Sequence, residues 1–354
     1  MRVLVVNAGS SSLKLRLLGP DDAVLAARDV PAGDEEALRA FLAGLEHVDV
    51  AGHRVVHGGA RFRGPAVVDD EVLGALRDLV VLAPLHQPGS LAGIEAVARA
   101  LRGVPNVACF DTAFHATLPA AAATYAVPRE WRVRRYGFHG LSHAYAARRA
   151  AELCGHGRRR IVTCHLGAGA SLAAVLDGRA VDTTMGFTPL EGLAMATRSG
   201  SVDPGMLLWL LQRGEISVED MHDALEHRSG MRALAGTSEM EAVVARAEAH
   251  EPRALLAFEV YVHRLRAAIG AMAASLSGLD VLVFTGGVGE NAPAVRAAAC
   301  GPLSFLGVGL DGRRNVRADG DADIGADHAA VRTLVVTARE DLEIARQARA
   351  VLAG

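Results

Sequence analysis

Residues 3–18 read VLVVNAGSSSLKLRLL, an apolar strand, a tight Gly/Ser turn and a second apolar strand. Small residues at such a turn let backbone N–H groups approach an anion closely, and hydroxyl groups add further donors. Lys14 follows the turn and supplies a compact positive charge. The segment therefore predicts a phosphate-binding hairpin that uses Ser10, Ser12 and Lys14. Because the turn leads into a strand, we expect no helix amino terminus to take part.

Two further glycine-rich turns follow along the chain. Residues 161–175, IVTCHLGAGASLAAV, repeat the opening pattern of strand, polar residue, glycine turn and strand about 160 residues downstream. This separation is too long for a solenoid repeat and indicates a duplicated domain, with the two loops facing each other across a cleft. Residues 284–291, FTGGVGEN, follow a strand and open a helix, where a nucleotide approaches the backbone closely.

Length and composition limit the possible functions. A chain of 354 residues predicts about two domains, and a net charge of −3 argues against nucleic-acid or anionic-membrane partners. The four cysteines have no CxxC spacing, which disfavours zinc and disulfides and favours a reduced, cytoplasmic compartment. No apolar run reaches the roughly 18 residues of a membrane span. The short basic runs at 132–135 and 158–160 are expected to be solvated connectors.

Strands alternate with helices, which predicts an α/β chain with mixed sheets covered on both faces. The expected strands are residues 2–7, 13–18, 23–29, 50–56, 105–111, 160–165, 170–176, 280–285 and 332–336. The expected helices are residues 34–46, 69–82, 90–102, 141–154, 203–212, 217–227, 252–276 and 340–352. Asp34 is expected to cap the first of these helices.

Nine ordered segments resemble the acetate kinase family (acetate and propionate kinases), in the superfamily that also contains actin, Hsp70 and sugar kinases. They are NAGSSSLK (7–14), GHRVVHGG (52–59), APLHQPGSLAGI (83–94), FDTAFHATLP (110–119), YGFHGLSH (136–143), CHLGAGAS (164–171), MGFTPLEGLAMATRSG (185–200), FTGGVGEN (284–291) and REDLEIA (339–345). The resemblance implies a duplicated actin-like (ribonuclease H-like) α/β fold of two domains with a cleft between them. It also implies a carboxylate kinase that transfers the γ-phosphoryl group of ATP to acetate or propionate.

The resemblance assigns catalytic roles to Arg54, Asp111, His139 and Arg198. These residue types suit phosphoryl transfer, which depends on positioning the reactants and neutralising charge on the equatorial oxygens. Arginine binds carboxylate and phosphate oxygens through its planar fork. Further matches in the same motifs are His86 and His143, to which we assign no definite role.

The remaining family positions bind the ligands. Asn7 and Glu340 match the residues that hold Mg²⁺ (or Mn²⁺), and Arg54, Val56, Leu85 and Pro189 match the pocket of the carboxylate. The donor is expected to contact Ser10, Ser12, Lys14, His165, Gly167, Gly169, Gly287, Gly289 and Asn291. The implied domains are 1–113 plus 340–354 and 114–339, with Glu340 facing Asn7, and the implied assembly is a homodimer.

The sequence departs from the family pattern mainly around the nucleotide. Ala168 replaces an asparagine of the second loop, and Glu241 aligns with an arginine that lies over the adenine. A carboxylate does not stack on a purine as a guanidinium does. In addition, residues 86–90 read HQPGS in place of HNPPN, and Arg339 replaces a small polar residue beside Glu340.

Three alternatives follow from these observations. The donor could be another nucleotide or pyrophosphate. The chain could be an Hsp70-like module that binds or hydrolyses a nucleotide and signals by closure. A sugar or hydroxyl kinase would need a carboxylate base, for which Asp111 is the candidate. Two arginines suit an anionic acceptor better, and an ionised carboxylate needs no base.

Overall fold

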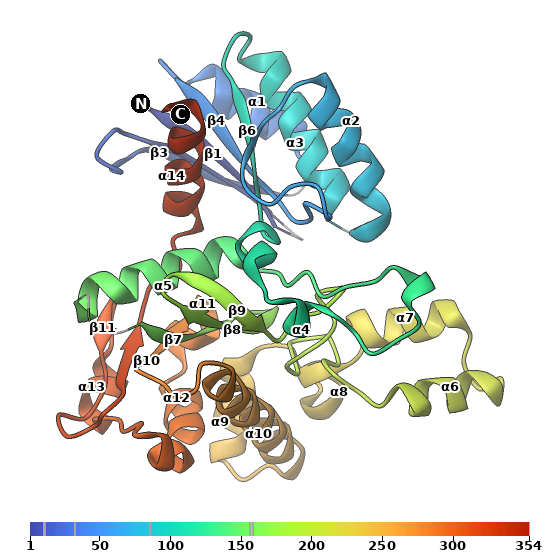
Figure 1. Ribbon diagram of the computed structural model, residues 1–354, viewed down its shortest axis with the longest axis vertical. Coiled ribbons are helices and arrows are strands. Elements are labelled where there is room, and N and C mark those ends of the chain that lie inside the picture. Colours follow the sequence, from blue (N-terminus) through green and yellow to red (C-terminus); the bar gives the residue numbers. More distant parts are fainter. Residues whose placement is uncertain (10–11, 32, 85, 156, 158, 354) are drawn as a thin grey trace. The chain divides into compact units, whose positions relative to one another are not determined.

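The computed structural model describes residues 1–9, 12–31, 33–84, 86–155, 157 and 159–353. Ser10 and Leu85, two of the predicted site residues, lie outside these ranges. The chain forms two compact units (Figure 1). The first comprises Met1–Ala116, Phe138–Tyr145 and Arg339–Gly354, and the second comprises Thr117–Gly137 and Ala146–Ala338. Each unit contains one six-stranded sheet among the described residues.

The sheet of the first unit has the strand order β3-β2-β1-β4-β6-β5. Strands β1, β4 and β6 are parallel, β2 pairs antiparallel with β1, and β3 pairs antiparallel with β2 at the edge of the sheet. The elements are β1 (Val3–Ala8), β2 (Ser12–Leu18), β3 (Val24–Pro31), α1 (Glu35–Ala43), β4 (Val50–Val55), β5 (Ala66–Val67), α2 (Asp70–Asp78), α3 (Gln87–Ala100), β6 (Asn106–Phe110) and α14 (Glu340–Ala353).

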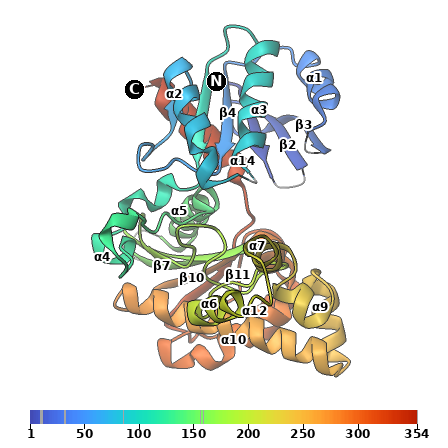
Figure 2. The same cartoon turned by 90° about the vertical axis from the view of Figure 1, so that its right-hand side faces the viewer.

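Helices cover both faces of this sheet. Along β1, Val3 and Val5 pack with Ile344 of α14, whereas Leu4 and Val6 pack with residues of α1 and α3. A strand buried on both faces requires a continuous apolar run, which is why residues 3–6 contain only Val and Leu. In Figure 2, α1, α2 and α3 stand in front of the sheet and α14 stands behind it.

The sheet of the second unit has the order β11-β12-β10-β7-β8-β9. Its elements are α4 (Ala120–Ala123), β7 (Arg160–Leu166), β8 (Ala170–Leu176), β9 (Arg179–Thr183), α6 (Pro204–Gln212), α7 (Val218–His227), α8 (Gly230–Ala235), α9 (Met240–Glu248), α10 (Pro252–Ser275), β10 (Val281–Thr285), α11 (Gly286–Asn291), α12 (Pro293–Cys300), α13 (Gly312–Arg317), β11 (Ala322–Asp323) and β12 (Arg332–Val335). Helix α5 (Gly140–Cys154) begins in the first unit and continues in the second.

The two sheets repeat one design. In each, an antiparallel meander (β1–β2–β3 or β7–β8–β9) is followed by two strands parallel to its first strand (β4 and β6, or β10 and β12). The duplication predicted from residues 161–175 is therefore confirmed at the level of topology. This repeated order makes the chain a duplicated actin-like α/β protein, as the sequence predicted.

All nine predicted strands and all eight predicted helices are present with shifts of a few residues at their ends. The helix predicted over residues 69–82 is α2 followed by a 3₁₀ turn, Leu79–Leu82. Asp34 caps α1 as predicted, because its side chain accepts a hydrogen bond from the N–H of Ala37. No helix among the described residues combines the length and the apolar character that a membrane span requires.

Candidate functional site

The first unit gathers polar side chains at one edge of its sheet. Asn7 lies near the end of β1, Arg54 near the end of β4, and Asp111 directly after β6. Since these three strands are parallel, their carboxyl ends meet at the same edge, which is where α/β sheets bind ligands. Three of the predicted site residues are thus brought together by the strand order.

Arg54 and Asp111 form a buried ion pair at this edge. Nε and Nη2 of Arg54 donate to Oδ2 of Asp111 over 3.0 and 2.6 Å, and Nη1 donates to the carbonyl oxygen of Ala8 over 2.7 Å. The Asp111 side chain is 1% exposed. Burial raises the pKa of Asp111, the nearby carboxylate of Glu340 raises it further, and Arg54 opposes both effects. The pair therefore holds the guanidinium in a fixed orientation with its charge available at the sheet edge.

A second polar contact lies beside this pair. Nδ2 of Asn7 donates to Oε2 of Glu340 over 2.8 Å, and Glu340 is the first residue of α14. The predicted approach of Glu340 to Asn7 is confirmed. The other Asp111 oxygen, Oδ1, is buried and has no hydrogen-bond partner among the described residues.

These oxygens fit a hard divalent cation. Mg²⁺ takes one or two carboxylates and completes its shell with water and substrate phosphates, so it does not need a cluster of protein ligands. The described residues contain no group of three or more His, Cys, Asp or Glu side chains able to hold a metal by themselves. The orphaned Oδ1 of Asp111, the Glu340 carboxylate and the Asn7 amide oxygen form a donor set of the preferred type.

His139 is placed next to Asp111 by its neighbour Gly140. The N–H of Gly140 donates to the carbonyl oxygen of Asp111 over 2.9 Å, and a Cβ on Gly140 would lie 2.0 Å from that oxygen. Only glycine allows this approach. His139 itself has a φ of +55°, a left-handed conformation that costs free energy in a non-glycine residue and is enriched at functional sites. The motif thus brings the backbone of His139–Gly140 against the backbone of Asp111.

Residues 56–58, which follow β4, are held in place by side chains to which the sequence analysis assigned no role. The side chain of Gln87 is buried and exchanges two hydrogen bonds with the backbone of His57, at 3.3 and 3.2 Å. Val56, which immediately precedes His57, is buried. The hydroxyl group of Thr112 accepts the N–H of Gly58 over 2.9 Å. The HQPGS departure therefore has a structural role. Nothing in the sequence indicated this role, because the backbone groups that Gln87 satisfies belong to a segment 30 residues away.

The segment from β1 to β2 has the predicted hairpin form. The N–H of Gly9 donates to the carbonyl oxygen of Ser12 over 2.8 Å, which closes the turn between β1 and β2. Lys14 pairs directly with Asn7 across the two antiparallel strands. Opposed residues point to the same face of a sheet, so Lys14 lies on the same face as Asn7.

The second unit contains the two remaining glycine-rich turns, and the structure brings them together. His165 lies near the end of β7, and the N–H of Gly167 donates to the carbonyl oxygen of Gly169 over 2.9 Å. Gly286 begins α11 after β10 with a φ of +80°. A Cβ on Gly286 would lie 2.8 Å from the carbonyl oxygen of Leu166. The two turns are therefore packed backbone against backbone, at the carboxyl ends of neighbouring parallel strands.

The tip of the third turn is open. Gly287 is exposed, Gly289 is buried, and Nδ2 of Asn291 donates to the carbonyl oxygen of Gly287 over 2.9 Å. The exposed glycine leaves room for a ligand to approach the backbone.

Arg198 and Pro189 also lie together in the second unit. Nη1 of Arg198 donates to the carbonyl oxygen of Pro189 over 3.2 Å, and Nε lies 3.2 Å from Oε2 of Glu226. Burial lowers the pKa of Arg198 and Glu226 opposes this shift. The Glu226 carboxylate offsets part of the cost of burying the guanidinium charge and limits its motion.

A second group of residues was missed by the sequence analysis. Arg135 was expected to be a solvated connector, but this prediction is wrong. Its guanidinium donates to the carbonyl oxygens of residues 183–185 and to Oε1 of Glu191 over 2.7 Å. The hydroxyl group of Tyr125 donates to the other Glu191 oxygen and accepts the N–H of Phe187. The three side chains support the segment that carries Pro189. An arginine inside a short basic run gave no distinguishing signal.

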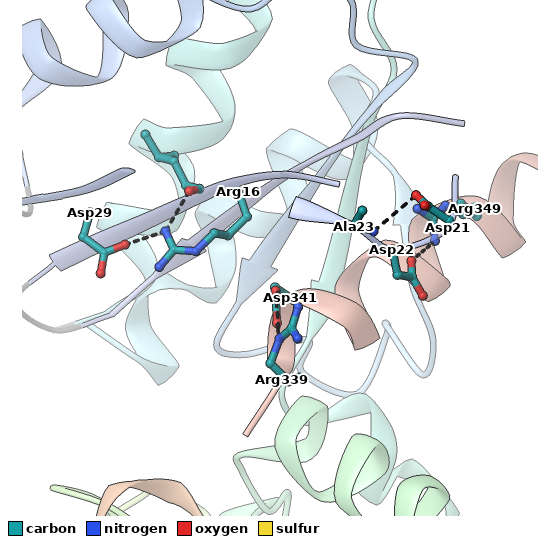
Figure 3. Close-up of polar contacts among 9 residues, drawn as sticks. Arg16, Asp21, Asp22, Ala23, Asp29, Arg339, Asp341 and Arg349 are labelled. Atoms are coloured by element: carbon teal, nitrogen blue, oxygen red, sulfur yellow. Dashed lines mark hydrogen bonds and ion pairs between the residues drawn. The ribbon is translucent and has the colours of Figure 1, made fainter. Parts of the chain in front are cut away.

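Three of the family departures lie in the described residues with defined surroundings. Glu241 is exposed in the first turn of α9, and the N–H of Ala196 donates to the carbonyl oxygen of Ala168 over 3.1 Å. Figure 3 shows Arg339 paired with Asp341, with Nε–Oδ1 and Nη2–Oδ2 both 2.9 Å apart. Arg339, which immediately precedes α14, is thus paired with a carboxylate in the first turn of that helix.

The duplicated sheets, with charged side chains and glycine-rich turns at the strand ends, place the chain in the actin-like class of α/β proteins. A model of the Acetokinase family matches residues 34–346. The chain belongs to this family.

An acetate kinase of Trichormus variabilis is 44% identical over 398 residues, covering 98% of each chain. The crystal structure of Porphyromonas gingivalis acetate kinase matches with a TM-score of 0.92 at 35% identity, covering 99% of each chain. A propionate kinase of Francisella tularensis matches with a TM-score of 0.92 at 32% identity, again covering 99% of each. The alignment of 398 residues is longer than this chain of 354, so the Trichormus protein carries segments that this chain lacks.

Proposed function

We propose that the protein is a carboxylate kinase that transfers the γ-phosphoryl group of ATP reversibly to acetate or propionate, giving an acyl phosphate and ADP. Membership of the Acetokinase family supports this proposal. The observation that carries it is the buried Arg54–Asp111 pair beside Asn7–Glu340 and the His139 motif, all at one sheet edge. A binding module without chemistry on a carboxylate would not need this fixed guanidinium.

In this mechanism, Arg54 holds a carboxylate oxygen of the acceptor, and Asp111 keeps the guanidinium in place. The acceptor is ionised at neutral pH, so its oxygen attacks the γ-phosphorus without prior proton removal. His139 and Arg198 stabilise charge on the equatorial phosphoryl oxygens, where most of the catalytic effect of such sites arises. Val56, Leu85 and Pro189 surround the alkyl group of the acceptor.

The donor is held by the glycine-rich turns. We assign the phosphates to Ser10, Ser12, Lys14, His165, Gly167 and Gly169, and the nucleoside to Gly287, Gly289 and Asn291. Asn7 and Glu340, with Asp111, would hold Mg²⁺ or Mn²⁺, which supplies charge neutralisation between the phosphates. We further propose a cytoplasmic homodimer without nucleic-acid or membrane partners, with domains 1–113 plus 340–354 and 114–339.

A different phosphoryl donor is the second candidate within this class. Glu241 is exposed where the family has an arginine over the adenine, and Ala168 lacks a polar side chain. The change at Glu241 removes a guanidinium from the adenine, and the change at Ala168 removes a side-chain donor to a phosphate or sugar oxygen. Pyrophosphate or another nucleoside triphosphate is then the donor to compare with ATP.

The experiment is a hydroxamate assay for acyl phosphate with acetate, propionate and butyrate, each with ATP, GTP and pyrophosphate in the presence of Mg²⁺. We expect product from acetate or propionate, and the donor with the highest kcat/KM identifies the donor class. Absence of acyl phosphate with every pair would overturn the proposed function. The Arg54→Ala variant serves as the inactive control.

A further inference from the structure

One carboxylate joins the third glycine-rich turn to the crossover at the end of the second unit. Oε1 of Glu290 accepts the N–H of Gly286 over 2.8 Å and the N–H of Ala338 over 2.9 Å. Gly286 directly follows β10, and Ala338 lies three residues after the end of β12. These two strands are parallel neighbours. A single oxygen atom therefore fixes the separation of two backbone segments at the carboxyl edge of the sheet.

The backbone of Glu290 is fixed as well. Nη1 of Arg296 donates to the carbonyl oxygens of Gly289 and Glu290 over 2.8 and 2.7 Å. Arg296 is 1% exposed, and its other nitrogens donate to Oδ1 and the carbonyl oxygen of Asn315 over 2.7 and 2.6 Å. A buried guanidinium bound to carbonyl oxygens at a helix end is a costly arrangement unless every donor is used. Glu290 is thus held from both its carbonyl and its carboxylate.

The linked segments carry two different parts of the proposed site. Gly286 begins the turn assigned to the nucleoside, and Glu340, assigned to the metal, follows Ala338 by two residues along the chain. A displacement of the turn relative to β12 would stretch or break one of these two hydrogen bonds unless Ala338 moved with the turn, because both amides share one acceptor. The side chain that joins these two segments, Glu290, is not one that the sequence analysis assigned to the site.

We propose that Glu290 is a positioning residue that couples occupation of the Gly286–Asn291 turn by ATP to the placement of the crossover before Glu340. This inference rests on the proposed function. Glu290 acts through its two amide contacts and does not touch the reacting atoms. Its oxygen, and not its charge, is the required feature, so glutamine is expected to replace it and alanine is not.

The test compares Glu290→Ala, Glu290→Gln and the wild type. Asp280→Ala is the matched control, because Oδ2 of Asp280 accepts two backbone N–H groups, of Arg159 and Arg160, over 3.1 and 3.0 Å. Asp280 lies immediately before β10, at the opposite end of the strand from Glu290. Thermal denaturation of all four proteins identifies a variant that fails to fold.

Two measurements report on positioning. Titration calorimetry with ATP, with and without Mg²⁺, is expected to show about tenfold weaker binding for Glu290→Ala, equivalent to one or two lost hydrogen bonds. Glu290→Gln and Asp280→Ala should bind within about twofold of the wild type, the scale of an unperturbed site. In hydrogen exchange, ATP should protect the amides around Ala338 in the wild type and Glu290→Gln, but not in Glu290→Ala.

Each outcome is decisive for one of the two proposals. Equal ATP binding and equal protection in the wild type and Glu290→Ala would overturn the positioning role, as would a wild type that does not bind ATP. The same would follow if Asp280→Ala lost as much affinity as Glu290→Ala, because the effect would then be general loosening of β10. Absence of acyl phosphate from a wild type that shows the expected binding pattern would overturn the proposed function alone. If Glu290→Ala does not fold, Glu290→Gln provides the test. Weaker ATP-dependent protection of the amides around Ala338 in Glu290→Gln than in the wild type would overturn the proposed role of the side-chain oxygen.

Discussion

Replacing Arg54 by alanine should damage stability and activity for separable reasons. The change removes three hydrogen bonds, two to Asp111 and one to Ala8, and leaves a carboxylate that is 1% exposed without its cation. Breaking a buried ion pair from one side costs about 3–5 kcal/mol. The Arg54 side chain is only 13% exposed, so solvent screening does not reduce this value much. We expect a loss of about 3–5 kcal/mol in the free energy of unfolding of the first unit.

The loss of activity should exceed what unfolding explains. An arginine that holds the transferring groups contributes about 10³–10⁵-fold in kcat. The double variant Arg54→Ala/Asp111→Asn removes the orphaned charge and should regain about 1–3 kcal/mol of stability, the usual coupling between residues in contact. It should regain no activity, because the guanidinium is still absent.

The assay must report on the correct unit. Both tryptophans, Trp131 and Trp209, belong to the second unit, so their fluorescence is a poor probe of Arg54. Hydrogen exchange of the β4 and β6 amides measures the first unit directly, and the hydroxamate assay measures catalysis. Arg16→Ala is the matched control, since Arg16 pairs with Asp29 at a site where Asp29 is 52% exposed (Figure 3). It should cost at most about 1 kcal/mol. A loss below 1 kcal/mol for Arg54→Ala, or activity in the double variant, would refute the reasoning.

Three other perturbations have defined outcomes. Gly140→Ala places a Cβ 2.0 Å from the Asp111 carbonyl oxygen, so misplacement of His139 should lower kcat at least about 100-fold in the hydroxamate assay. An active Gly140→Ala variant would contradict this packing argument. The control is Gly74→Ala in α2, where nothing lies within 4 Å, and it should raise the midpoint of thermal unfolding. Burial lowers the pKa of His53, His57 and His115 to about 4. Below pH 6.5 the unfolded chain protonates each histidine and the folded protein does not, so the free energy of unfolding falls as the pH decreases toward 4. The loss at pH 5 should be about 2 kcal/mol per histidine. Urea unfolding at pH 7 and pH 5 measures the difference in the free energy of unfolding between the two pH values. His53→Asn should reduce this difference, whereas His263→Asn, at an exposed position, should not. An unchanged difference in His53→Asn would argue against a neutral buried imidazole. Glu241→Arg should lower the KM for ATP several-fold, because a guanidinium can stack on the purine. Glu248→Arg, at the other end of α9, should leave the KM unchanged. Equal effects of the two substitutions would indicate nonspecific attraction between the added positive charge and ATP.

The sequence alone determined the class of fold and the chemistry of the strand ends. Val/Leu-rich strands between amphipathic helices require a covered mixed sheet, and the echo of residues 3–18 in residues 161–175 required two of them. The short elements β5, β9 and β11 and the helices α4, α8, α9, α12 and α13 were not predicted. Most of them are too short to show a clear periodicity, and they form because neighbouring segments supply hydrogen-bond partners and apolar contacts.

Tertiary structure decided which polar groups face one another. Arg54 and Asp111 are 57 residues apart, and Asn7 and Glu340 are 333 apart, so only the parallel order of β1, β4 and β6 and the return of α14 bring them together. The roles of Gln87, Arg135 and Glu290 were invisible in the sequence for the same reason. A buried polar side chain takes its function from the backbone groups that it satisfies, and those groups come from segments that local sequence patterns do not relate.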